Sequence, residues 1–235
     1  MRRRPERIRV ERGAPLELVV MARWPAPGRC KHRLASGCGP VRAAAVQARL
    51  TIHTLTAAAR ARQRARATDP ARRLVVVLAV EGIGPRAARR WGQRLGADRV
   101  RRQGRGSLGL RMRRQLLQSR RAGARAVVLI GSDLPGLEAA DLLAAFAALE
   151  QGEREQSALV LGPARDGGYW LIGVQGHLRP AALAGLFSGI GAAIDWGGPQ
   201  VLARTLAAAD AAGLVPRLLA ERADLDRPAD LEAWR

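Results

Sequence analysis

The chain has 235 residues, of which 48% are hydrophobic, and it carries a formal net charge of +20. That apolar fraction supports a buried core and excludes a wholly disordered chain, and no run approaches the roughly 18 consecutive apolar residues of a membrane-spanning helix. The charge suits a nucleic-acid-binding protein, but arginines occur in nearly every segment and aromatic residues make up only 3% of the chain, so a base-stacking surface is poorly supplied.

The chain begins with a basic stretch, residues 1–14, which lacks the apolar run and small-residue cleavage site of a secretory signal. We expect this stretch to form a solvated, mobile arm in front of one large domain at residues 15–235. The two cysteines, Cys30 and Cys38, have neither the spacing of a zinc site nor the number of a disulfide framework. The sequence therefore favours a reducing cytoplasm as the compartment of the protein.

Short apolar runs rich in β-branched residues alternate with alanine-rich stretches of helical character. The apolar runs predict strands at residues 16–22, 73–80, 124–132, 157–164, 169–174 and 214–220. The alanine-rich stretches predict helices at residues 39–65, 85–96, 107–123, 138–152 and 199–213, with a short helix near Pro228. This order indicates an α/β fold in which one mainly parallel sheet has helices on both faces. Because such sheets bind ligands beyond the carboxyl ends of their strands, the residues that follow the strands are the first candidates for a site.

The segment after the first expected strand, residues 23–34, contains Lys31, the only lysine in the chain. Gly28 allows a sharp turn there, and a loop that leaves a buried strand and enters a helix presents backbone N–H groups to an anion. Lys31 adds a compact point charge and Arg33 a planar guanidinium, two groups that suit a phosphate. The segment therefore predicts a phosphate-binding loop, with a solvated basic loop as the simpler alternative.

Asp133 follows another expected strand and precedes a Pro-Gly turn. A carboxylate in that position can hold Mg²⁺ or Mn²⁺ over a diphosphate, or it can satisfy local backbone donors in an Asx-turn. Near the C-terminus lie three more aspartates, Asp224, Asp226 and Asp230. Asp230 has the position of a helix-capping carboxylate, which leaves Asp226 as the second candidate metal ligand. Convergence of Asp133 and Asp226 would itself favour a metal, because two like charges about 4 Å apart cost about 4 kcal/mol at an effective dielectric constant of about 20.

An Asp-Gly-Gly-Tyr run lies between two expected strands and predicts a tight hairpin turn. The same turn suits a substrate site. Gly167 and Gly168 would let the backbone approach a substrate. Asp166 would bind a hydroxyl or assist as a base, and Tyr169, the only tyrosine, would line the pocket.

Glycines at positions 104, 106 and 109 lack the spacing of the dinucleotide-binding fingerprint. They indicate the start of a helix with Ser107 as its N-cap, from which Arg111 could face a phosphate. Trp196 is interpreted as a core or lid contact.

Five motifs, taken in order, resemble the glycosyltransferase-like family known as radical-SAM/selenodomain-associated transferase 1, which is also linked to arsenosugar biosynthesis. The motifs are ARWPAPGRCKHRL, LGLRM, IGSDLPGL, GPARDGGYWLIG and DLDRPADL, and the match runs from about Leu16 to Trp234. The resemblance implies a GT-A-like, Rossmann-like fold of the nucleotide-diphospho-sugar transferase type. Arg23 and His32 stand where the family pattern has lysine and threonine. The single Asp133 replaces the Asp-x-Asp that is usual in sugar transferases and is closer to the pattern of nucleotidylyltransferases.

The resemblance implies a metal-dependent enzyme that transfers a sugar from a nucleotide-sugar donor to a small-molecule acceptor. Together with the residue patterns, it assigns catalysis to Lys31, Arg33 and Asp133, nucleotide binding to Ala22, Gly28, Lys31, Arg33 and Arg111, substrate binding to Asp166, Gly167, Gly168 and Tyr169, and Mg²⁺ or Mn²⁺ to Asp133 and Asp226.

Two other functions stay open at this point. A nucleotidylyltransferase would join an NTP to a phosphorylated small molecule and release pyrophosphate, with Lys31 and Arg33 on the triphosphate. A basic nucleic-acid-binding protein without enzymatic activity would bind duplex phosphates, and its affinity would fall steeply as salt rises.

Overall fold

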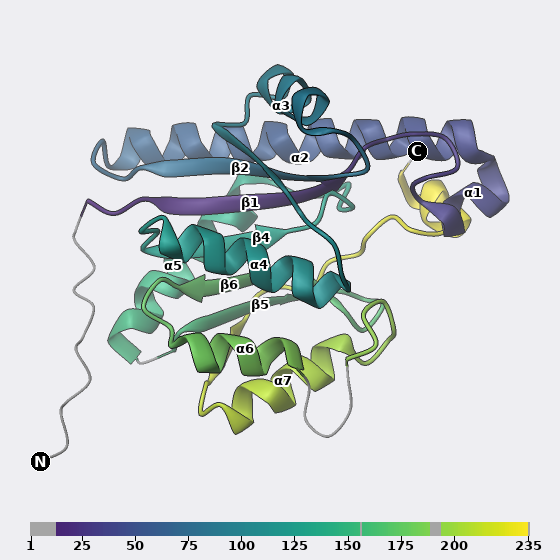
Figure 1. Ribbon diagram of the computed structural model, residues 1–235. Coiled ribbons are helices and arrows are strands. Elements are labelled where there is room, and N and C mark those ends of the chain that lie inside the picture. Colours follow the sequence, from purple (N-terminus) through teal and green to yellow (C-terminus); the bar gives the residue numbers. More distant parts are fainter. Residues whose placement is uncertain (1–12, 156, 189–193, 235) are drawn as a thin grey trace, which may run out of the picture.

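The computed structural model describes residues 13–155, 157–188 and 194–234, so most of the predicted arm at residues 1–14 lies outside the described residues. The described chain forms a seven-stranded sheet in the order β3-β2-β1-β4-β6-β5-β7 (Figure 1). The strands are β1 (Leu16–Arg23), β2 (Leu74–Glu81), β3 (Arg99–Arg102), β4 (Ala126–Ile130), β5 (Leu159–Pro163), β6 (Tyr169–Gln175) and β7 (Pro216–Leu218). The helices are α1 (His32–Cys38), α2 (Pro40–Thr68), α3 (Pro85–Arg94), α4 (Leu108–Arg121), α5 (Ala139–Glu155), α6 (Pro180–Ser188), α7 (Val201–Ala211) and the 3-10 helix η1 (Pro228–Trp234).

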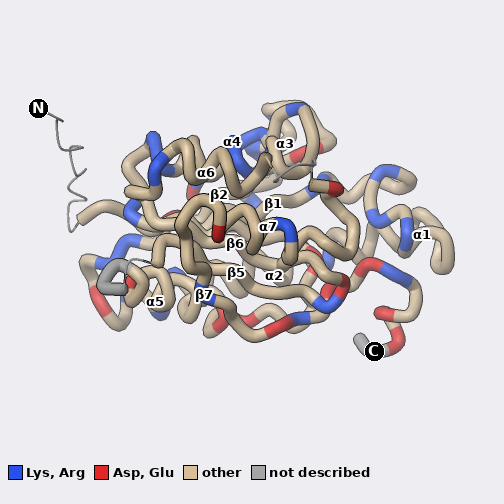
Figure 2. Tube along the Cα trace, turned by 90° about the horizontal axis from the view of Figure 1, so that it is seen from below, with Lys and Arg blue, Asp and Glu red and all other residues tan. Residues whose placement is uncertain are grey.

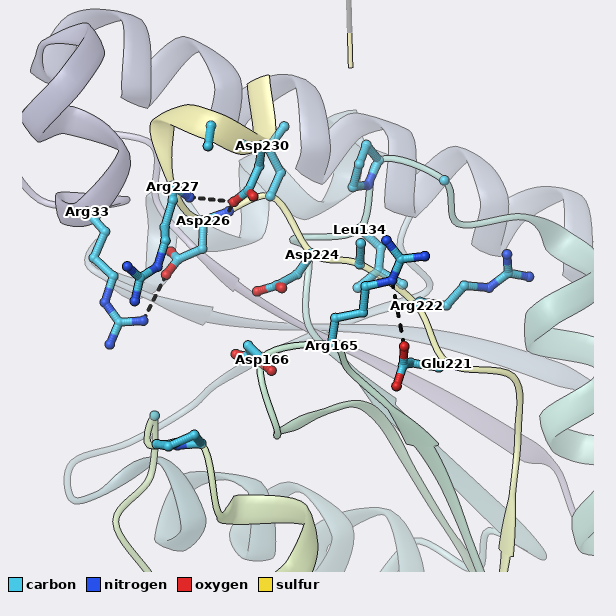
Figure 3. Close-up of a pocket in the computed structure, with 17 residues that line it drawn as sticks. Arg33, Leu134, Arg165, Asp166, Glu221, Arg222, Asp224, Asp226, Arg227 and Asp230 are labelled. Atoms are coloured by element: carbon cyan, nitrogen blue, oxygen red, sulfur yellow. Dashed lines mark hydrogen bonds and ion pairs between the residues drawn. The ribbon is translucent and has the colours of Figure 1, made fainter. Parts of the chain in front are cut away.

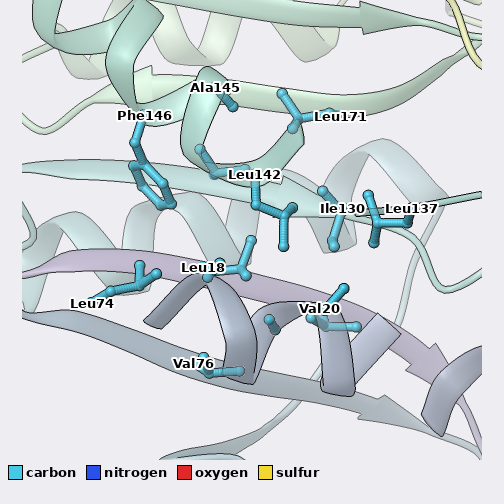
Figure 4. Close-up of a cluster of buried hydrophobic side chains, with 14 of the residues drawn as sticks. Leu18, Val20, Leu74, Val76, Ile130, Leu137, Leu142, Ala145, Phe146 and Leu171 are labelled. Carbon is cyan, nitrogen blue, oxygen red and sulfur yellow. The ribbon is translucent and has the colours of Figure 1, made fainter. Parts of the chain in front are cut away.

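Helices cover both faces of the sheet (Figure 1). On one face α2, α3 and α5 pack over the strands, and on the other α4, α6 and α7 do so. Along β1, Leu18 and Val20 face the first layer, whereas Val19 and Met21 face the second. Figure 4 shows part of the first layer, in which Leu18 and Val20 share a cluster with Phe146 of α5. Burial on both faces explains why the central strands are continuous apolar runs instead of alternating polar and apolar residues.

The strand directions confirm the predicted mainly parallel sheet with helices on both faces. β1 pairs in parallel with β2 and β4, and β2 pairs in parallel with β3. β6 runs antiparallel to β4 and β5, and the predicted hairpin turn joins β5 to β6. The strand order changes direction between β1 and β4, which is where open α/β sheets form their ligand crevice.

Three elements of the structure were not predicted from the sequence: α1, β3 and α6. The sequence of β3, Arg-Val-Arg-Arg, contains no apolar run, so its backbone pairing with β2 gives no sequence signal. Glu17 of β1 is fully buried, and its carboxylate binds Arg99 at 2.5 Å and Arg101 at 3.0 Å. These charge-assisted contacts hold β3 across β2, because leaving the buried carboxylate without partners would be strongly destabilising.

The C-terminal segment returns to the start of the chain. Leu225 packs with Leu34 of α1 and with Val46 and Leu50 of α2 in a small buried cluster. The backbone N–H of Leu225 also donates to the carbonyl of Asp133, just beyond β4, at 2.9 Å. Residues 224–230 therefore lie against both α1 and the carboxyl end of β4.

Basic residues lie on several elements, α1, α3, α4 and α7 among them, and do not gather in one stripe (Figure 2). Within the described part of the chain, each helix is either too short or too polar to cross a bilayer.

Candidate functional site

A cavity of about 670 Å³ opens at the carboxyl ends of β1 and β4. Its walls include four of the residues predicted to act on a nucleotide or a metal: Lys31, Arg33, Asp133 and Asp226. They come from the loop after β1, from α1, from the end of β4 and from the segment before η1. The structure thus brings three chain-distant segments together at the point where the strand order changes direction.

Lys31 joins two of these segments. Its Nζ lies 2.6 Å from Oδ1 of Asp133 and also donates to the carbonyl of Leu225. The Lys31 side chain is only 4% exposed, whereas that of Asp133 is 42% exposed, so the carboxylate still faces the cavity. Among the described residues other than glycine, Lys31 alone has a positive φ, 50°. A backbone conformation of this kind costs about 1 kcal/mol or more in strain. Strain of this kind persists where surrounding contacts hold a residue in a required position.

A second ion pair ties the C-terminal segment to α1. Arg33 Nη1 donates to Asp226 Oδ2 at 3.1 Å, and both side chains are partly exposed at the cavity edge. Asp230 accepts hydrogen bonds from the backbone N–H groups of Asp226 and Arg227, at 2.9 and 2.6 Å. The predicted capping role of Asp230 is therefore observed, and this cap fixes the backbone that carries Asp226.

A neighbouring cavity of about 870 Å³ shares Arg33 and Asp226 with the first. Figure 3 shows the carboxylates of Asp224 and Asp166 facing each other in its centre. Burial raises the pKa of Asp224 to about 6, and repulsion from Asp166 is the next cause. Asp133 and Asp226 add further contributions in the same direction. Three other carboxylates therefore lie close enough to Asp224 to oppose its ionisation.

The turn between β5 and β6 places the predicted substrate-binding residues at this junction. Asp166 Oδ1 accepts a hydrogen bond from the backbone N–H of Gly168 at 2.9 Å, which is the Asx-type contact of a hairpin turn. Gly167 has a φ of 86°, and a Cβ there would lie 1.9 Å from the carbonyl oxygen of Pro199. Gly167 is therefore required by packing against the segment before α7. Tyr169 lines the first cavity, and burial raises the pKa of its phenol.

The structure gives each of the other predicted nucleotide-binding residues, Ala22, Gly28 and Arg111, a structural contact or position of its own. Arg111 lines the cavity, but it pairs with Glu81 and Gln103 instead of standing free for a phosphate. Ala22 is buried, and its carbonyl accepts a hydrogen bond from Gln103. Gly28 has a φ of 72° and lies in an exposed turn, so its contribution is to the shape of the loop and it does not line the cavity.

Two residues of the site were not predicted. Asp224 was recognised only as part of an acidic run, because sequence spacing does not reveal that it faces Asp166. Glu81 closes a uniformly apolar strand, and a charged residue at the carboxyl end of such a strand was a signal that could have identified it.

Trp196 stacks on Phe187 with ring centroids 5.7 Å apart and also lines the cavity, so it is both a core and a wall residue.

The donor chemistry of the site fits a hard divalent cation. Mg²⁺ prefers carboxylate oxygens and is commonly held by one or two carboxylates together with substrate phosphates. Asp133 and Asp226 supply two partly exposed carboxylates in one cavity. Within the described ranges, no group of three His, Cys, Asp or Glu residues forms a metal-binding cluster, so waters or substrate oxygens would complete the coordination.

A family model for DUF2064, described as an uncharacterized protein conserved in bacteria, matches residues 59–193, which is more than half of the chain. Among curated proteins, none matches.

Solved structures resemble more than 90% of the chain. A protein of Desulfovibrio desulfuricans G20, provisionally titled a nucleotide-diphospho-sugar transferase, is 23% identical, with a TM-score of 0.68 over 91% of this chain and 83% of that one. 4-Diphosphocytidyl-2C-methyl-D-erythritol synthase from Anaerococcus prevotii DSM 20548 is 10% identical, with a TM-score of 0.57 over 94% and 96% of the two chains. Mannosyl-3-phosphoglycerate synthase from Rubrobacter xylanophilus is 12% identical, with a TM-score of 0.53 over 94% and 70%. At these identities the likeness establishes the fold alone, and it confirms the predicted GT-A-like architecture, which nucleotidyltransferases share.

Proposed function

We propose that this chain, which belongs to the bacterial protein family DUF2064, is a metal-dependent glycosyltransferase that takes a nucleotide sugar as donor and a small molecule as acceptor. The observation that carries the proposal is the buried ammonium of Lys31, bound to Asp133 and to the carbonyl of Leu225 in a cavity that Asp226 also lines. The five motifs that resemble the radical-SAM/selenodomain-associated transferase 1 family support it. The fold is shared by sugar transferases and by nucleotidyltransferases.

Lys31 and Arg33 act on the diphosphate of the donor. When the bond from the sugar to the phosphate oxygen breaks, negative charge grows on the departing nucleoside diphosphate. A buried ammonium in a fixed position stabilises that charge without having to reorganise, whereas the more exposed Arg33 binds from the cavity edge. On donor binding, Lys31 shares its charge between Asp133 and the phosphate.

Asp133 and Asp226 would hold the cation. Bound Mg²⁺ or Mn²⁺ supplies a Lewis acid that neutralises diphosphate charge. The backbone that carries these two aspartates is held in place, because Leu225 N–H donates to the carbonyl of Asp133 and Asp230 accepts from the N–H of Asp226.

The acceptor binds at the turn between β5 and β6. Gly168 and Tyr169 shape this end of the site, and Asp166 faces Asp224 across the adjoining cavity. A carboxylate at that place can accept a hydrogen bond from an acceptor hydroxyl and take its proton as the new bond to the sugar forms.

Nucleotidyl transfer is the second candidate. The specific observation in its favour is the single Asp133 at the end of β4, where sugar transferases of this fold usually carry two aspartates. In that reaction Lys31 and Arg33 bind the triphosphate, and pyrophosphate is the leaving group.

A product assay separates the two reactions. Purified protein with Mn²⁺ is incubated with a panel of nucleotide sugars and, separately, with NTPs and sugar phosphates, and release of nucleoside diphosphate or pyrophosphate is measured. Glycosyl transfer predicts nucleoside diphosphate from nucleotide sugars, including slow donor hydrolysis without an acceptor. Release of pyrophosphate from an NTP overturns the sugar-transfer proposal, and duplex DNA binding without either product favours the non-enzymatic alternative.

Chelation tests the cation. Thorough treatment with EDTA is expected to abolish turnover, and addition of Mn²⁺ or Mg²⁺ is expected to restore it. Full activity after chelation would exclude the metal role of Asp133 and Asp226.

A further inference from the structure

A buried polar network lies in the wall of the 670 Å³ cavity, where Gln47 of α2 reaches the residues that follow β4. Gln47 is 4% exposed, and its amide Nε2 donates to Ser132 Oγ at 3.0 Å and to Thr51 Oγ1 at 3.3 Å. Ser132 is 2% exposed and directly precedes Asp133. Because Gln47 and Ser132 both line the cavity, the network connects the interior of the protein to the place where a ligand would bind.

Thr51 fixes which end of the Gln47 amide faces Ser132. The Thr51 hydroxyl donates to the backbone carbonyl of Gln47 at 2.8 Å, so its oxygen can only accept from the amide. The amide nitrogen therefore lies between the two hydroxyl groups, and Ser132 Oγ is the acceptor in its bond with Gln47. The hydroxyl hydrogen of Ser132 is left to donate elsewhere, and it has no acceptor among the residues that the structure describes.

We propose that the Ser132 hydroxyl, oriented by Gln47, donates a hydrogen bond to a phosphate oxygen of the donor's diphosphate. Phosphate suits this hydroxyl because an ionised phosphate oxygen carries no proton and only accepts, and because Lys31 and Arg33 bring positive charge to the same cavity. Ser132 is then a binding residue, and Gln47 is a positioning residue that acts through it. The inference rests on the proposed function, because it requires the diphosphate to lie beside Asp133.

The burial of this network adds to the value of the contact. Gln47 holds the Ser132 oxygen before a ligand arrives, so little conformational freedom is lost on binding. A ligand without an acceptor at this place would leave the hydroxyl hydrogen of Ser132 unpaired, and such a ligand would bind less tightly.

Inorganic pyrophosphate is the probe, because it carries a diphosphate without a base or a sugar. Its dissociation constant is measured by titration calorimetry with Mn²⁺ present. Ser132→Ala is expected to weaken pyrophosphate binding by at least about tenfold, the effect of losing a hydrogen bond to a charged group. Ser132→Thr keeps a hydroxyl group and is expected to restore most of the affinity.

Ser119→Ala is the matched control. Ser119 is fully buried and accepts a hydrogen bond from Arg101 Nη1 at 2.7 Å, but it does not line the cavity. The control is expected to lower the melting temperature and to leave the affinity for pyrophosphate unchanged.

A double-mutant cycle tests the role of Gln47. Gln47→Leu removes the amide at similar volume and is expected to weaken pyrophosphate binding by about threefold, because the Ser132 hydroxyl is no longer oriented. In the Ser132→Ala background the same substitution is expected to change the affinity little, since no hydroxyl is left to orient. Additive losses would show that Gln47 acts independently of Ser132 and would contradict its positioning role.

The outcomes separate this inference from the proposed function. Pyrophosphate binding that Ser132→Ala leaves unchanged overturns the Ser132 contact and leaves the proposed function standing. Where the parent protein binds a nucleoside diphosphate but not pyrophosphate, the same variants are compared with that nucleotide. Absence of binding of pyrophosphate and of every common nucleoside diphosphate overturns both.

Discussion

The two walls of the cleft differ in how their carboxylates are paired with cations. One wall is formed by the loop after β1, by α1, by the end of β4 and by Asp226 of the C-terminal segment. Each carboxylate on it has a cation: Asp133 has Lys31 and Asp226 has Arg33. On the wall formed by the β5–β6 turn, Asp166 and Asp224 face each other, and their repulsion contributes to the raised pKa of Asp224. Under the proposed function, the first wall would receive phosphate at cations that are already in place, whereas the carboxylates of the second wall would accept a proton or a hydrogen bond.

The largest effect is expected from removing the buried ammonium group of Lys31 from the first wall. Lys31→Ala is expected to lower turnover by on the order of 10²–10³-fold, because a preorganised charge on the leaving diphosphate is lost. Its thermal unfolding is expected to stay cooperative, since Asp133 is 42% exposed and remains hydrated without its partner. Arg33→Ala, at the more exposed ion pair, is the comparison and should cost less. An unchanged rate for Lys31→Ala removes this residue from the mechanism.

The next largest effect is expected at Gly167, which packs the β5–β6 turn of the second wall against Pro199. Gly167→Ala places a methyl group 1.9 Å from the Pro199 carbonyl oxygen and also strains a φ of 86°. We expect a loss of about 3 kcal/mol or more of unfolding free energy, measured by denaturant titration. Gly28→Ala is the matched control, since its φ is 72° but nothing lies within 4 Å of the added atom. The control should cost only about 1 kcal/mol, and equal losses would contradict the packing role of Gly167.

The repulsion in the second wall predicts a pH dependence of stability. In the folded protein Asp224 has a pKa of about 6, above its ordinary value of 3.8, so between these values the folded state binds more protons than the unfolded state. The contribution of Asp224 to the unfolding free energy should therefore fall as pH rises through this window, and the fall is complete about one pH unit above the folded pKa.

Asp224→Asn tests this sign. The variant should melt at a higher temperature than the parent at about pH 7.5, with little difference at about pH 4. Asp210→Asn, on the exposed face of α7, should leave the difference between the two pH values unchanged. A lower melting temperature for Asp224→Asn at the higher pH would show that the carboxylate is stabilising.

The smallest effect concerns the thiols near the first wall. Cys30 is 1% exposed, and burial raises its pKa, which lowers the fraction of reactive thiolate. Cys38 is half-buried and should be alkylated first when the rate at each thiol is followed by mass spectrometry. Faster labelling of Cys30 would show that the loop around Lys31 opens readily.

The sequence predicted several residues of the first wall, and there are physical reasons why it did not predict their contacts. Lys31, Asp133 and Asp226 were identified because unusual residues follow buried strands or crowd a short acidic run. Their contacts could not be predicted, because the pairing of Lys31 with Asp133 spans 102 positions and depends on which strands become neighbours. Arg111 was expected at a phosphate, and its ion pair with Glu81 follows from the packing of α4 beside the ends of β2 and β3.

By itself, the sequence determined the layered α/β character of the protein, because strands buried on both faces must be apolar along their whole length and amphipathic helices must cover them. Tertiary structure alone decided that β6 pairs with β4, that β3 forms from an arginine-rich segment, and that Asp224 faces Asp166. Each of these depends on pairing between distant segments, for which the local pattern of residues carries no signal.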